Sequence, residues 1–519
     1  MISSRPWLVL VAFVLLAPAC ATRTANPTPV PPKGAHYTAD SERRTADGGP
    51  RTADKAVRTL RSDLDRVFNA PIMARGVWGV DVRSLQTGER LYELNSRRLM
   101  MPASNMKIVT LATAAEAVGW DYRYTTTLET SAAVVDGVLD GDLFLRSNGD
   151  PTINSRGNRA DAVLTEWGHA LRAAGIREIR GRVIGDDQAF DDEGIGPGWS
   201  WDYLEAGYAA PSGALQFNEN TAALTVSPRA AGEPAVVTLQ PGTGLTILSR
   251  ATTGAAGSAE TIEYRRRIDG LVIEISGSIP AGGKPVRRTI AVANPTLFFA
   301  QALKDALDAR GIAVTGPAAD FDDVAAEFVS APERRVLVST ASPPLREIAI
   351  VLMKVSQNLY AETFLKTLGA TSGGLGTTFA GRSAARRTLE AWSIPQDAHV
   401  IADGSGLSRY NYLAPEAIVA VLERMHRDDK HRDAFVTTLP IAGKDGTIST
   451  RLRRTRAEGN AAAKTGSIAN VRSLSGYVKT RDGEPLVFSI VANDFVIPAA
   501  TVTYIADVAV EILANFSRK

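Results

Sequence analysis

The alternation of apolar and polar residues predicts two β-hairpins near opposite ends of the chain. The first pairs residues 77–82 with residues 91–94 across a turn that contains Gly88. The second pairs residues 474–478 with residues 486–492 across an Arg-Asp-Gly turn. Both hairpins are expected in one domain, because helical patterns accompany each of them.

Apolar residues at helical spacing predict the helices of that domain. The first runs over residues 102–118, directly after the first hairpin. Helical spacing returns at 295–311 and 345–368, and a final helix covers 502–516. Ser104 is therefore expected at a helix N-terminus, where the dipole and free amides favour developing negative charge.

A segment of different composition lies between these two groups of elements. Residues 125–320 are rich in glycine and alternate as strands do. About 460 residues follow the N-terminal region, a length typical of roughly three domains. We expect one α+β domain at 56–124 and 295–519, split by an α+β unit at 125–221 and a mostly-β unit at 222–294.

The N-terminus is typical of an exported protein. Residues 1–20 form a signal peptide whose apolar part is too short to cross a bilayer. It ends in Ala-Pro-Ala-Cys20, which fits either an A-x-A cleavage site or a lipobox, although Ala17 stands where a lipobox usually has leucine. Residues 21–55 have few large apolar residues and are predicted to be a disordered tether. The expected location is the periplasm or cell envelope, with membrane anchoring through Cys20 left open beside an incidental cysteine.

Composition excludes several function classes. Lys and Arg number 58 against 56 Asp and Glu, a formal net charge of +2, and no basic run of the kind that follows nucleic acid is present. Cys20 is the single cysteine, so no intramolecular disulfide can form. The five histidines, none within a motif, are His36, His169, His399, His426 and His431. A histidine-dependent triad or a zinc peptidase needs a placed histidine, so no metal or organic cofactor is expected.

Three short motifs carry the candidate chemistry. Ser104-Asn-Met-Lys107 places a hydroxyl and an amine one helical turn apart, so both can face one cleft. Ser356-Gln-Asn358 adds another hydroxyl and a carboxamide, and Lys464-Thr-Gly-Ser467 adds a cation beside a glycine. Each motif alone also fits an ordinary structural role: the first a solvated helix, the second a helix cap and the third the start of a strand. Together they favour a serine acyl-transfer site that uses lysine as its base.

The first two motifs suggest how protons would move. Ser104 would be the nucleophile and Lys107 its base, which requires a neutral amine. Burial or a nearby cation such as Lys464 would lower the pKa of Lys107 enough. Ser356 could relay a proton to the leaving amine, and Asn358 could hold Lys107 and a substrate amide.

The third motif suggests how substrate would be held. Lys464 and Thr465 could bind a terminal carboxylate, and Gly466 would let a substrate backbone lie close to the strand. The amides of Ser467 and Ser104 are the natural oxyanion donors.

Further stretches accompany the motifs, namely Asp121-Tyr-Arg-Tyr-Thr-Thr-Thr-Leu-Glu129, Gly149-Asp-Pro-Thr152, Pro197-Gly-Trp199, Asp403-Gly-Ser-Gly-Leu-Ser-Arg409 and Leu439-Pro-Ile-Ala-Gly-Lys-Asp-Gly446. With these, the chain resembles the low-molecular-mass penicillin-binding proteins of the D-alanyl-D-alanine carboxypeptidase/endopeptidase type, the group typified by penicillin-binding protein 4. The resemblance covers nearly everything after the tether, including the long insertion between the first two motifs. It implies a penicillin-binding/β-lactamase-like transpeptidase fold, in which helices flank an antiparallel sheet and two inserted domains split the chain.

The resemblance also implies a function. It is that of a serine D,D-peptidase, which hydrolyses D-Ala-D-Ala or D-Ala-diaminopimelate bonds of peptidoglycan stem peptides through an acyl-enzyme and is inhibited covalently by β-lactams. Asp150 and Arg409 would grip the zwitterionic end of diaminopimelate. Asp150 also fits a turn before Pro151, and Arg409 a structural ion pair. The inserted units would restrict which peptides enter, outside the chemistry itself.

Two rival functions remain. A β-lactamase would need a deacylating glutamate, which is not evident near the motifs. A non-catalytic peptidoglycan-binding scaffold lipoprotein would have no need of Ser104, Lys107 and Lys464 together.

Overall fold

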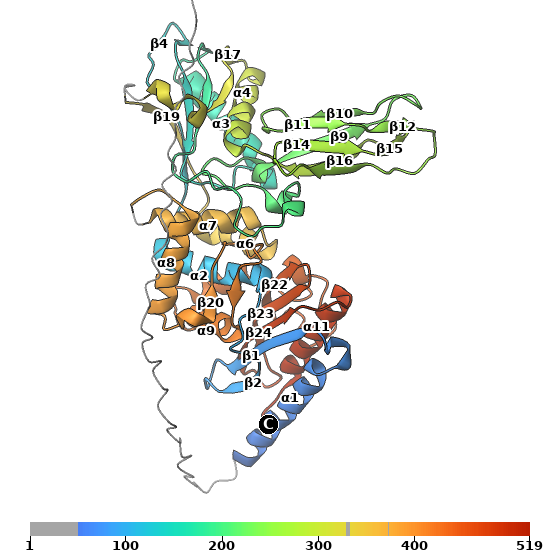
Figure 1. Cartoon of the computed structure of the whole chain (residues 1–519). Coiled ribbons are helices and arrows are strands. Elements are labelled where there is room, and N and C mark those ends of the chain that lie inside the picture. Colours follow the sequence, from blue (N-terminus) through green and yellow to red (C-terminus); the bar gives the residue numbers. More distant parts are fainter. Residues whose placement is uncertain (1–49, 329–332, 372) are drawn as a thin grey trace, which may run out of the picture. The chain divides into compact units, whose positions relative to one another are not determined.

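The computed structural model describes residues 50–328, 333–371 and 373–519 (Figure 1). Its central sheet has five antiparallel strands in the order β2-β1-β24-β23-β22, with the bounds β1 Val77–Ser84, β2 Arg90–Leu94, β22 Ala462–Ile468, β23 Val471–Lys479 and β24 Pro485–Asn493. Strand β1 pairs with β24 from Val77 opposite Asn493 to Ser84 opposite Leu486. The two predicted hairpins are thus confirmed, and they join edge to edge into one sheet.

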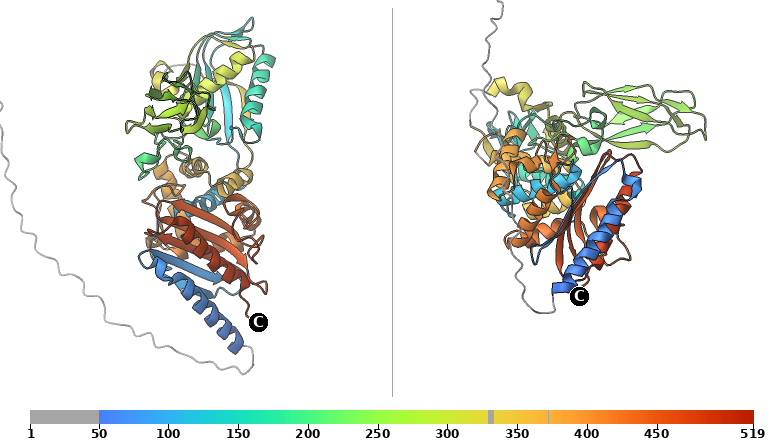
Figure 2. Two further views of the ribbon diagram at one scale, coloured as in Figure 1. Left: turned by 90° about the vertical axis from the view of Figure 1, so that its right-hand side faces the viewer. Right: turned by 60° about the horizontal axis from the view of Figure 1, so that its bottom comes forward.

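Helices cover both faces of this sheet (Figure 2). They are α1 Pro50–Phe68, α2 Met106–Val118, α6 Leu345–Lys354, α7 Asn358–Ala370, α8 Thr378–Ala391, α9 Pro415–Arg427, α10 Arg432–Thr438 and α11 Ala499–Asn515. Helices α1 and α11 pack on the face that carries Val80 and Val82, whereas α2 and α6–α10 form the core on the other face. Because α1 begins at Pro50, residues 50–55 are helical and the expected tether boundary at residue 55 is wrong. Cys20 and most of the tether lie outside the described residues.

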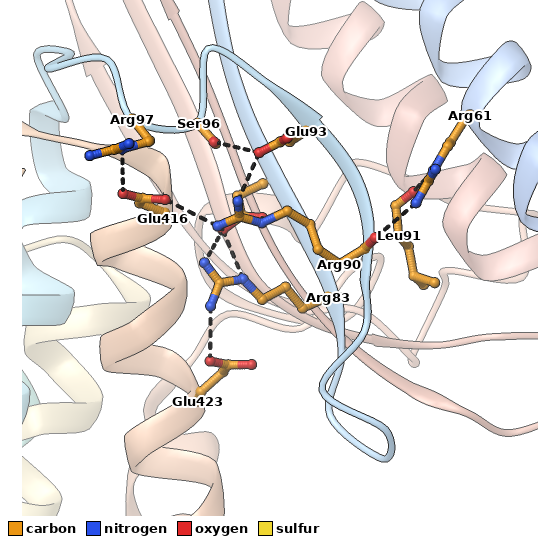
Figure 3. A network of polar contacts seen from close by, with 10 residues as sticks. Arg61, Arg83, Arg90, Leu91, Glu93, Ser96, Arg97, Glu416 and Glu423 are labelled. Carbon is orange, nitrogen blue, oxygen red and sulfur yellow. Dashed lines mark hydrogen bonds and ion pairs between the residues drawn. The ribbon is translucent and has the colours of Figure 1, made fainter. Parts of the chain in front are cut away.

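A network of ion pairs ties the first hairpin to α9 (Figure 3). Asp81 is fully buried on the face of β1 opposite Val80 and lies 2.6 Å from Arg83 and 3.0 Å from Arg90. These arginines in turn contact Glu423 at 3.3 Å and Glu416 at 3.1 Å on α9. Burial raises the pKa of Asp81, and the two arginines oppose that rise.

The first inserted unit is larger than the sequence suggests. One sheet has the order β18-β8-β6-β3-β19, with β3 Thr125–Thr130, β6 Leu143–Ser147, β8 Val183–Asp186, β18 Ala318–Asp320 and β19 Arg335–Ala341. A second sheet comprises β4 Val134–Val135, β5 Val138–Leu139, β7 Glu178–Ile179 and β17 Ala313–Val314. The helices of this inserted unit are α3 Arg159–Ala173, α4 Pro295–Ala309 and α5 Phe321–Val324.

This arrangement corrects the boundary expected at residue 295. Helix α4 shares its core with α3, and β19 pairs with β3 from Arg335 opposite Thr130 to Ala341 opposite Thr125, with one shift of register between Val336 and Val338. The chain therefore leaves this unit for the mostly-β unit, returns to complete it, and re-enters the domain that holds the central sheet near Ser342. Alternation alone cannot reveal such a return, because it depends on pairing between distant segments.

The second inserted unit consists of short strands with their own core. They are β9 Thr221–Ser227, β10 Val236–Leu239, β11 Thr246–Ser249, β12 Thr252–Gly254, β13 Glu263–Arg266, β14 Val272–Ser276, β15 Ser278–Pro280 and β16 Val286–Ala291. The core gathers residues such as Leu224, Ile273 and Ile290. Across the described part of the chain, every helix falls short of the length and apolar character that crossing a bilayer requires.

Candidate active site

Ser104 and Lys107 lie where α2 begins. Residues Ala103–Asn105 form a 3-10 turn, which leads directly into the almost wholly buried helix α2. The Lys107 Nζ atom lies 2.9 Å from Ser104 Oγ. Ser104 is half-buried and Lys107 completely buried, so a reactant can reach the hydroxyl while the amine is shielded from water.

The turn that carries Ser104 is held in an unusual conformation. Ala103 has φ of +45°, a left-handed conformation that an L-residue adopts only when its surroundings impose it. Strand β23 supplies the restraint, because Ser473 Oγ lies 2.7 Å from both the Pro102 carbonyl and Asn105 Oδ1. The hydroxyl of Ser104 is therefore placed by the sheet as well as by its own helix.

Three oxygen atoms surround the amine of Lys107. Besides Ser104 Oγ, they are Asn358 Oδ1 at 2.6 Å and the Ser405 carbonyl at 2.7 Å. A neutral amine can donate its two hydrogens to Asn358 and Ser405, and its lone pair then points at the Ser104 hydroxyl. This is the arrangement that a base needs before it removes a proton.

Burial accounts for the charge state of this amine. It lowers the pKa of Lys107 to about 7, although the carboxylates of Asp403 and Glu362 act in the opposite direction. Lys464 is also completely buried, and its pKa is lowered well below the ordinary value by burial and then by Lys107. Of the two causes considered from the sequence, burial is therefore the one that operates on Lys107.

The second motif lies between α6 and α7, where the helical pattern breaks. Ser356 adopts a left-handed conformation with φ of +64°, and its Oγ accepts a hydrogen bond of 2.8 Å from Lys464 Nζ. The Asn358 carboxamide reaches Lys107 through its oxygen and donates through Nδ2 to the Tyr208 carbonyl at 2.7 Å. Tyr208 belongs to the inserted region, which thus contacts the site directly.

The third motif is in β22, an edge strand of the central sheet. Lys464 points into the site, and Thr465 Oγ1 bonds Thr447 Oγ1 at 2.7 Å. Among the described residues, no strand pairs with the outer edge of Gly466 and Ser467, so an extended substrate could add there. The structure brings together all five residues expected at the catalytic centre, namely Ser104, Lys107, Ser356, Asn358 and Lys464.

The structure gives a further reason for a glycine at position 466 besides the expected contact with a substrate backbone. A Cβ atom there would lie 2.2 Å from Ser473 Oγ, 2.7 Å from the Pro102 carbonyl and 2.9 Å from the Ser104 amide nitrogen. Those atoms belong to the protein itself. The missing side chain therefore lets the strand approach the turn that carries Ser104, whatever it also offers to a substrate.

The geometry around Asp150 favours the turn alternative over the ligand role. Its side chain is fully buried, and Oδ1 accepts hydrogen bonds from the backbone of Thr152 at 2.8 Å and its hydroxyl at 2.6 Å. The other oxygen lies 3.6 Å from Arg159. Asp150 therefore stabilises the turn before α3, and its carboxylate offers no accessible surface to a substrate ammonium group.

Arg409 lies beside the end of β22. Its guanidinium donates to the Ala469 carbonyl at 3.3 Å, and the side chain is partly exposed. No described carboxylate forms an ion pair with it, so the structural ion pair considered from the sequence is absent from this part of the chain. The position leaves the guanidinium available to a substrate carboxylate.

Three residues near the site were given no role by the sequence. Glu362 and Asp403 are buried carboxylates close to Lys107, and Trp199 donates from Nε1 to Asp403 at 2.8 Å. Trp199 and Asp403 were visible as parts of family stretches, but neither periodicity nor spacing indicates that they meet. Glu362 follows the second motif by four positions, one helical turn after Asn358.

Comparison with known proteins agrees with this geometry. The family model described as "D-Ala-D-Ala carboxypeptidase 3 (S13) family" matches residues 60–515. The D-alanyl-D-alanine carboxypeptidase of an Actinomadura species is 34% identical over 452 residues, which cover 85% of this chain and 82% of that protein.

Solved structures give the same result for the fold. The crystal structure of penicillin binding protein 4 (dacB) from Haemophilus influenzae has a TM-score of 0.75 and 25% identity, covering 88% of this chain and 99% of that one. The same protein in complex with a β-lactam has a TM-score of 0.70 and 24% identity, covering 87% and 99%. The fold is therefore shared with that penicillin-binding protein over most of this chain. Since the family model spans most of the chain and the site has the parts of a serine acyl-transfer centre, the chain belongs to the D-Ala-D-Ala carboxypeptidase 3 (S13) family and is a serine-type D,D-peptidase.

Proposed function

We propose that Ser104 is the nucleophile of this D,D-peptidase and Lys107 its general base. The observation that carries the proposal is the 2.9 Å contact between a half-buried hydroxyl and a buried amine whose pKa is about 7. At neutral pH about half of the amine is uncharged and able to accept the hydroxyl proton. An ordinary exposed lysine would be almost entirely protonated and could not act in this way.

The reaction follows in two stages. Ser104 Oγ attacks the carbonyl of the penultimate D-Ala while its proton passes to Lys107, and the amides of Ser104 and Ser467 stabilise the oxyanion. The intermediate collapses as the C–N bond breaks, and the proton that Lys107 received passes through Ser356, which Lys464 contacts at 2.8 Å, to the leaving amine, so Lys107 is neutral again. Water then attacks the acyl-enzyme, gives one proton to the base and releases the shortened peptide with Ser104 restored.

We infer that the substrate lies along the open edge of β22. Lys464 and Thr465 would bind the terminal carboxylate, and the Arg409 guanidinium, which contacts the Ala469 carbonyl just after β22, would bind a carboxylate of a diaminopimelate side chain. Because Asp150 is buried in its turn, we infer that other residues recognise the matching ammonium group. The substrates are peptidoglycan stem peptides with D-Ala-D-Ala ends or D-Ala-diaminopimelate cross-links, and β-lactams acylate the same serine.

A labelled-penicillin gel tests this function. Wild-type protein is expected to give a stable band that Ser104→Ala abolishes. A label that appears and decays within minutes would indicate a β-lactamase. No label on folded wild-type protein would favour the non-catalytic scaffold and refute the proposal.

We propose that the protein is exported to the periplasm or cell envelope and anchored there through Cys20. The support is the signal-like sequence that ends at Cys20 and the apolar-poor segment after it. Fractionation of cells that express wild type and Cys20→Ala decides the point. Membrane association is expected for wild type alone, and a fully soluble wild-type protein would refute lipid anchoring.

A further inference from the structure

Two family stretches, Pro197–Trp199 and Asp403–Arg409, meet beside the catalytic lysine. The loop Asp403–Arg409 supplies the Ser405 carbonyl that contacts Lys107 Nζ at 2.7 Å. The segment Pro197–Trp199 comes from the inserted region and docks on that loop. Ser408 Oγ donates to the Pro197 carbonyl at 2.6 Å, and Trp199 Nε1 donates to Asp403 at 2.8 Å.

Asp403 is the centre of the loop. It is completely buried, and its carboxylate accepts the backbone N–H of Gly406 at 2.7 Å and of Ser408 at 2.6 Å. The side-chain amide of Asn411 adds a further bond of 2.6 Å. Such a concentration of donors around one carboxylate fixes the path of the loop. The hydrogen bond from Trp199 adds a further donor from outside the catalytic domain.

Glu362 holds the other side of the loop. Its two oxygens accept the backbone N–H of Gly404 at 2.9 Å and of Ser405 at 2.8 Å, so a buried carboxylate holds the two peptide groups that directly precede the Ser405 carbonyl. Helix α2 contributes as well, because Thr110 Oγ1 donates to the Gly404 carbonyl at 2.7 Å. The contact between Ser405 and Lys107 is therefore fixed from α7, from α2 and from the inserted region.

We propose that the loop Asp403–Arg409 is the positioning element of the catalytic lysine, and that Trp199 and Glu362 are the positioning residues that hold it. The inserted region is then part of the catalytic apparatus, in contrast to the purely selective role expected from the sequence. Misplacing a reacting group by about 1 Å can cost about a hundredfold in rate, so a support of this kind affects the chemical step rather than binding. The inference rests on the proposed role of Lys107 as the base.

The first test separates positioning from substrate contact. Trp199→Phe removes the N–H donor and keeps an aromatic ring, whereas Trp201→Phe makes the same change at a residue that is 52% exposed and, among the described residues, forms no side-chain hydrogen bond with the loop. With benzylpenicillin, Trp199→Phe is expected to lower the maximal acylation rate constant at least about tenfold, as for loss of a hydrogen bond to a charged group, with pre-equilibrium binding and melting temperature nearly unchanged. Trp201→Phe should match wild type.

Two results would overturn the role of Trp199. One is a wild-type acylation rate in Trp199→Phe, and the other is a loss confined to pre-equilibrium binding, which would make Trp199 a ligand-contact residue. Lys107→Arg, measured in the same assay, separates the proposed role of Trp199 from the proposed role of Lys107 as the base. If Lys107→Arg acylated normally, the proposed base would be wrong whatever the result at Trp199.

The second test concerns Glu362 and uses the pH profile. The titratable groups that face Lys107 are Glu362 from α7, Asp403 from the loop and Lys464 from β22. Burial raises the pKa of Glu362 to about 7, so its carboxyl group is partly ionised in the range where Lys107 titrates. Glu362→Gln removes this partial negative charge, which favours the protonated amine, so the acid limb of the acylation profile is expected to move to lower pH. Glu362→Asp keeps the charge and should leave that limb in place. An unmoved limb in Glu362→Gln, with only a lower melting temperature, would reduce Glu362 to a structural residue and overturn its positioning role.

Discussion

Replacement of Lys107 by arginine tests the assignment of the base most directly. The amine lies in a fully buried site, 2.9 Å from the Ser104 hydroxyl and within 2.7 Å of two further oxygen acceptors. Arginine can occupy the same region and donate to the same acceptors, but its guanidinium stays protonated at any pH that a protein tolerates. The variant therefore keeps a cation and loses a proton acceptor.

The magnitude follows from the pKa of Lys107, which is about 7. An unperturbed lysine with a pKa of about 10.4 would be neutral only about once in 2,500 molecules at pH 7, whereas about half of the Lys107 amines are neutral. Burial thus raises the population of active base about a thousandfold. Loss of general-base help of this kind costs about 10²- to 10⁴-fold, and we expect acylation by benzylpenicillin to fall by at least about a hundredfold.

The assay is the acylation rate constant, measured on protein whose cooperative thermal transition is intact. Lys479→Arg is the matched control, because Lys479 is exposed at the end of β23 and no ion pair involves it within the described residues. That variant should acylate as wild type does. A normal acylation rate in folded Lys107→Arg would refute the reasoning, since no neutral amine would then be available at that position.

Three more predictions concern pH, the turn at Asp150 and the network at Asp81. Because only neutral Lys107 accepts the proton, wild-type acylation should be full above pH about 7 and fall about tenfold per unit well below it; a rate that is flat down to pH 5 would contradict the assignment. Asp150→Ala should lower the free energy of unfolding by about 1–3 kcal/mol in denaturant titration, because the hydrogen bonds to Thr152 are lost. Hydrolysis of diaminopimelate-containing peptides and of simple D-Ala-D-Ala peptides should change equally. A loss of activity confined to the diaminopimelate-containing peptides would instead support a ligand role for Asp150. Asp81→Ala should lower the free energy of unfolding by about 2–3 kcal/mol, because it leaves Arg83 and Arg90 without their buried partner. Penicillin acylation of the folded protein should stay normal. An unchanged melting temperature would show that the ion-pair network contributes nothing to stability.

The features that the sequence predicted correctly depend on local pattern. The hairpins, the helix after Ser104 and the final helix all follow from alternation or helical spacing over a few residues. The catalytic centre was predictable for a related reason, because each motif keeps its chemistry within four residues. Only their assembly depends on the fold.

The features that were missed depend on contacts between distant residues. Strand β19 pairs with β3 across about two hundred positions, so the return of the chain to the first inserted unit leaves no local trace. Trp199 and Asp403 are likewise 204 positions apart. Asp150 is a different case, since Gly-Asp-Pro-Thr fits a turn and a binding loop equally well, and only its burial favours the turn.

The two glycines that press on the Ser104 turn restrict how this enzyme could escape inhibition. A Cβ atom at Gly406 would lie 1.8 Å from the Ala103 carbonyl, and one at Gly466 would lie 2.7 Å from the Pro102 carbonyl, so the turn is enclosed from two sides with no spare room. A drug and a natural peptide must both meet the serine in this single placement. Resistance that moves the serine away from a β-lactam would therefore move it away from the cell wall as well. Changes that discriminate between the two have to arise farther out, along the edge of β22 or in the inserted region, where the longer substrate extends beyond the inhibitor.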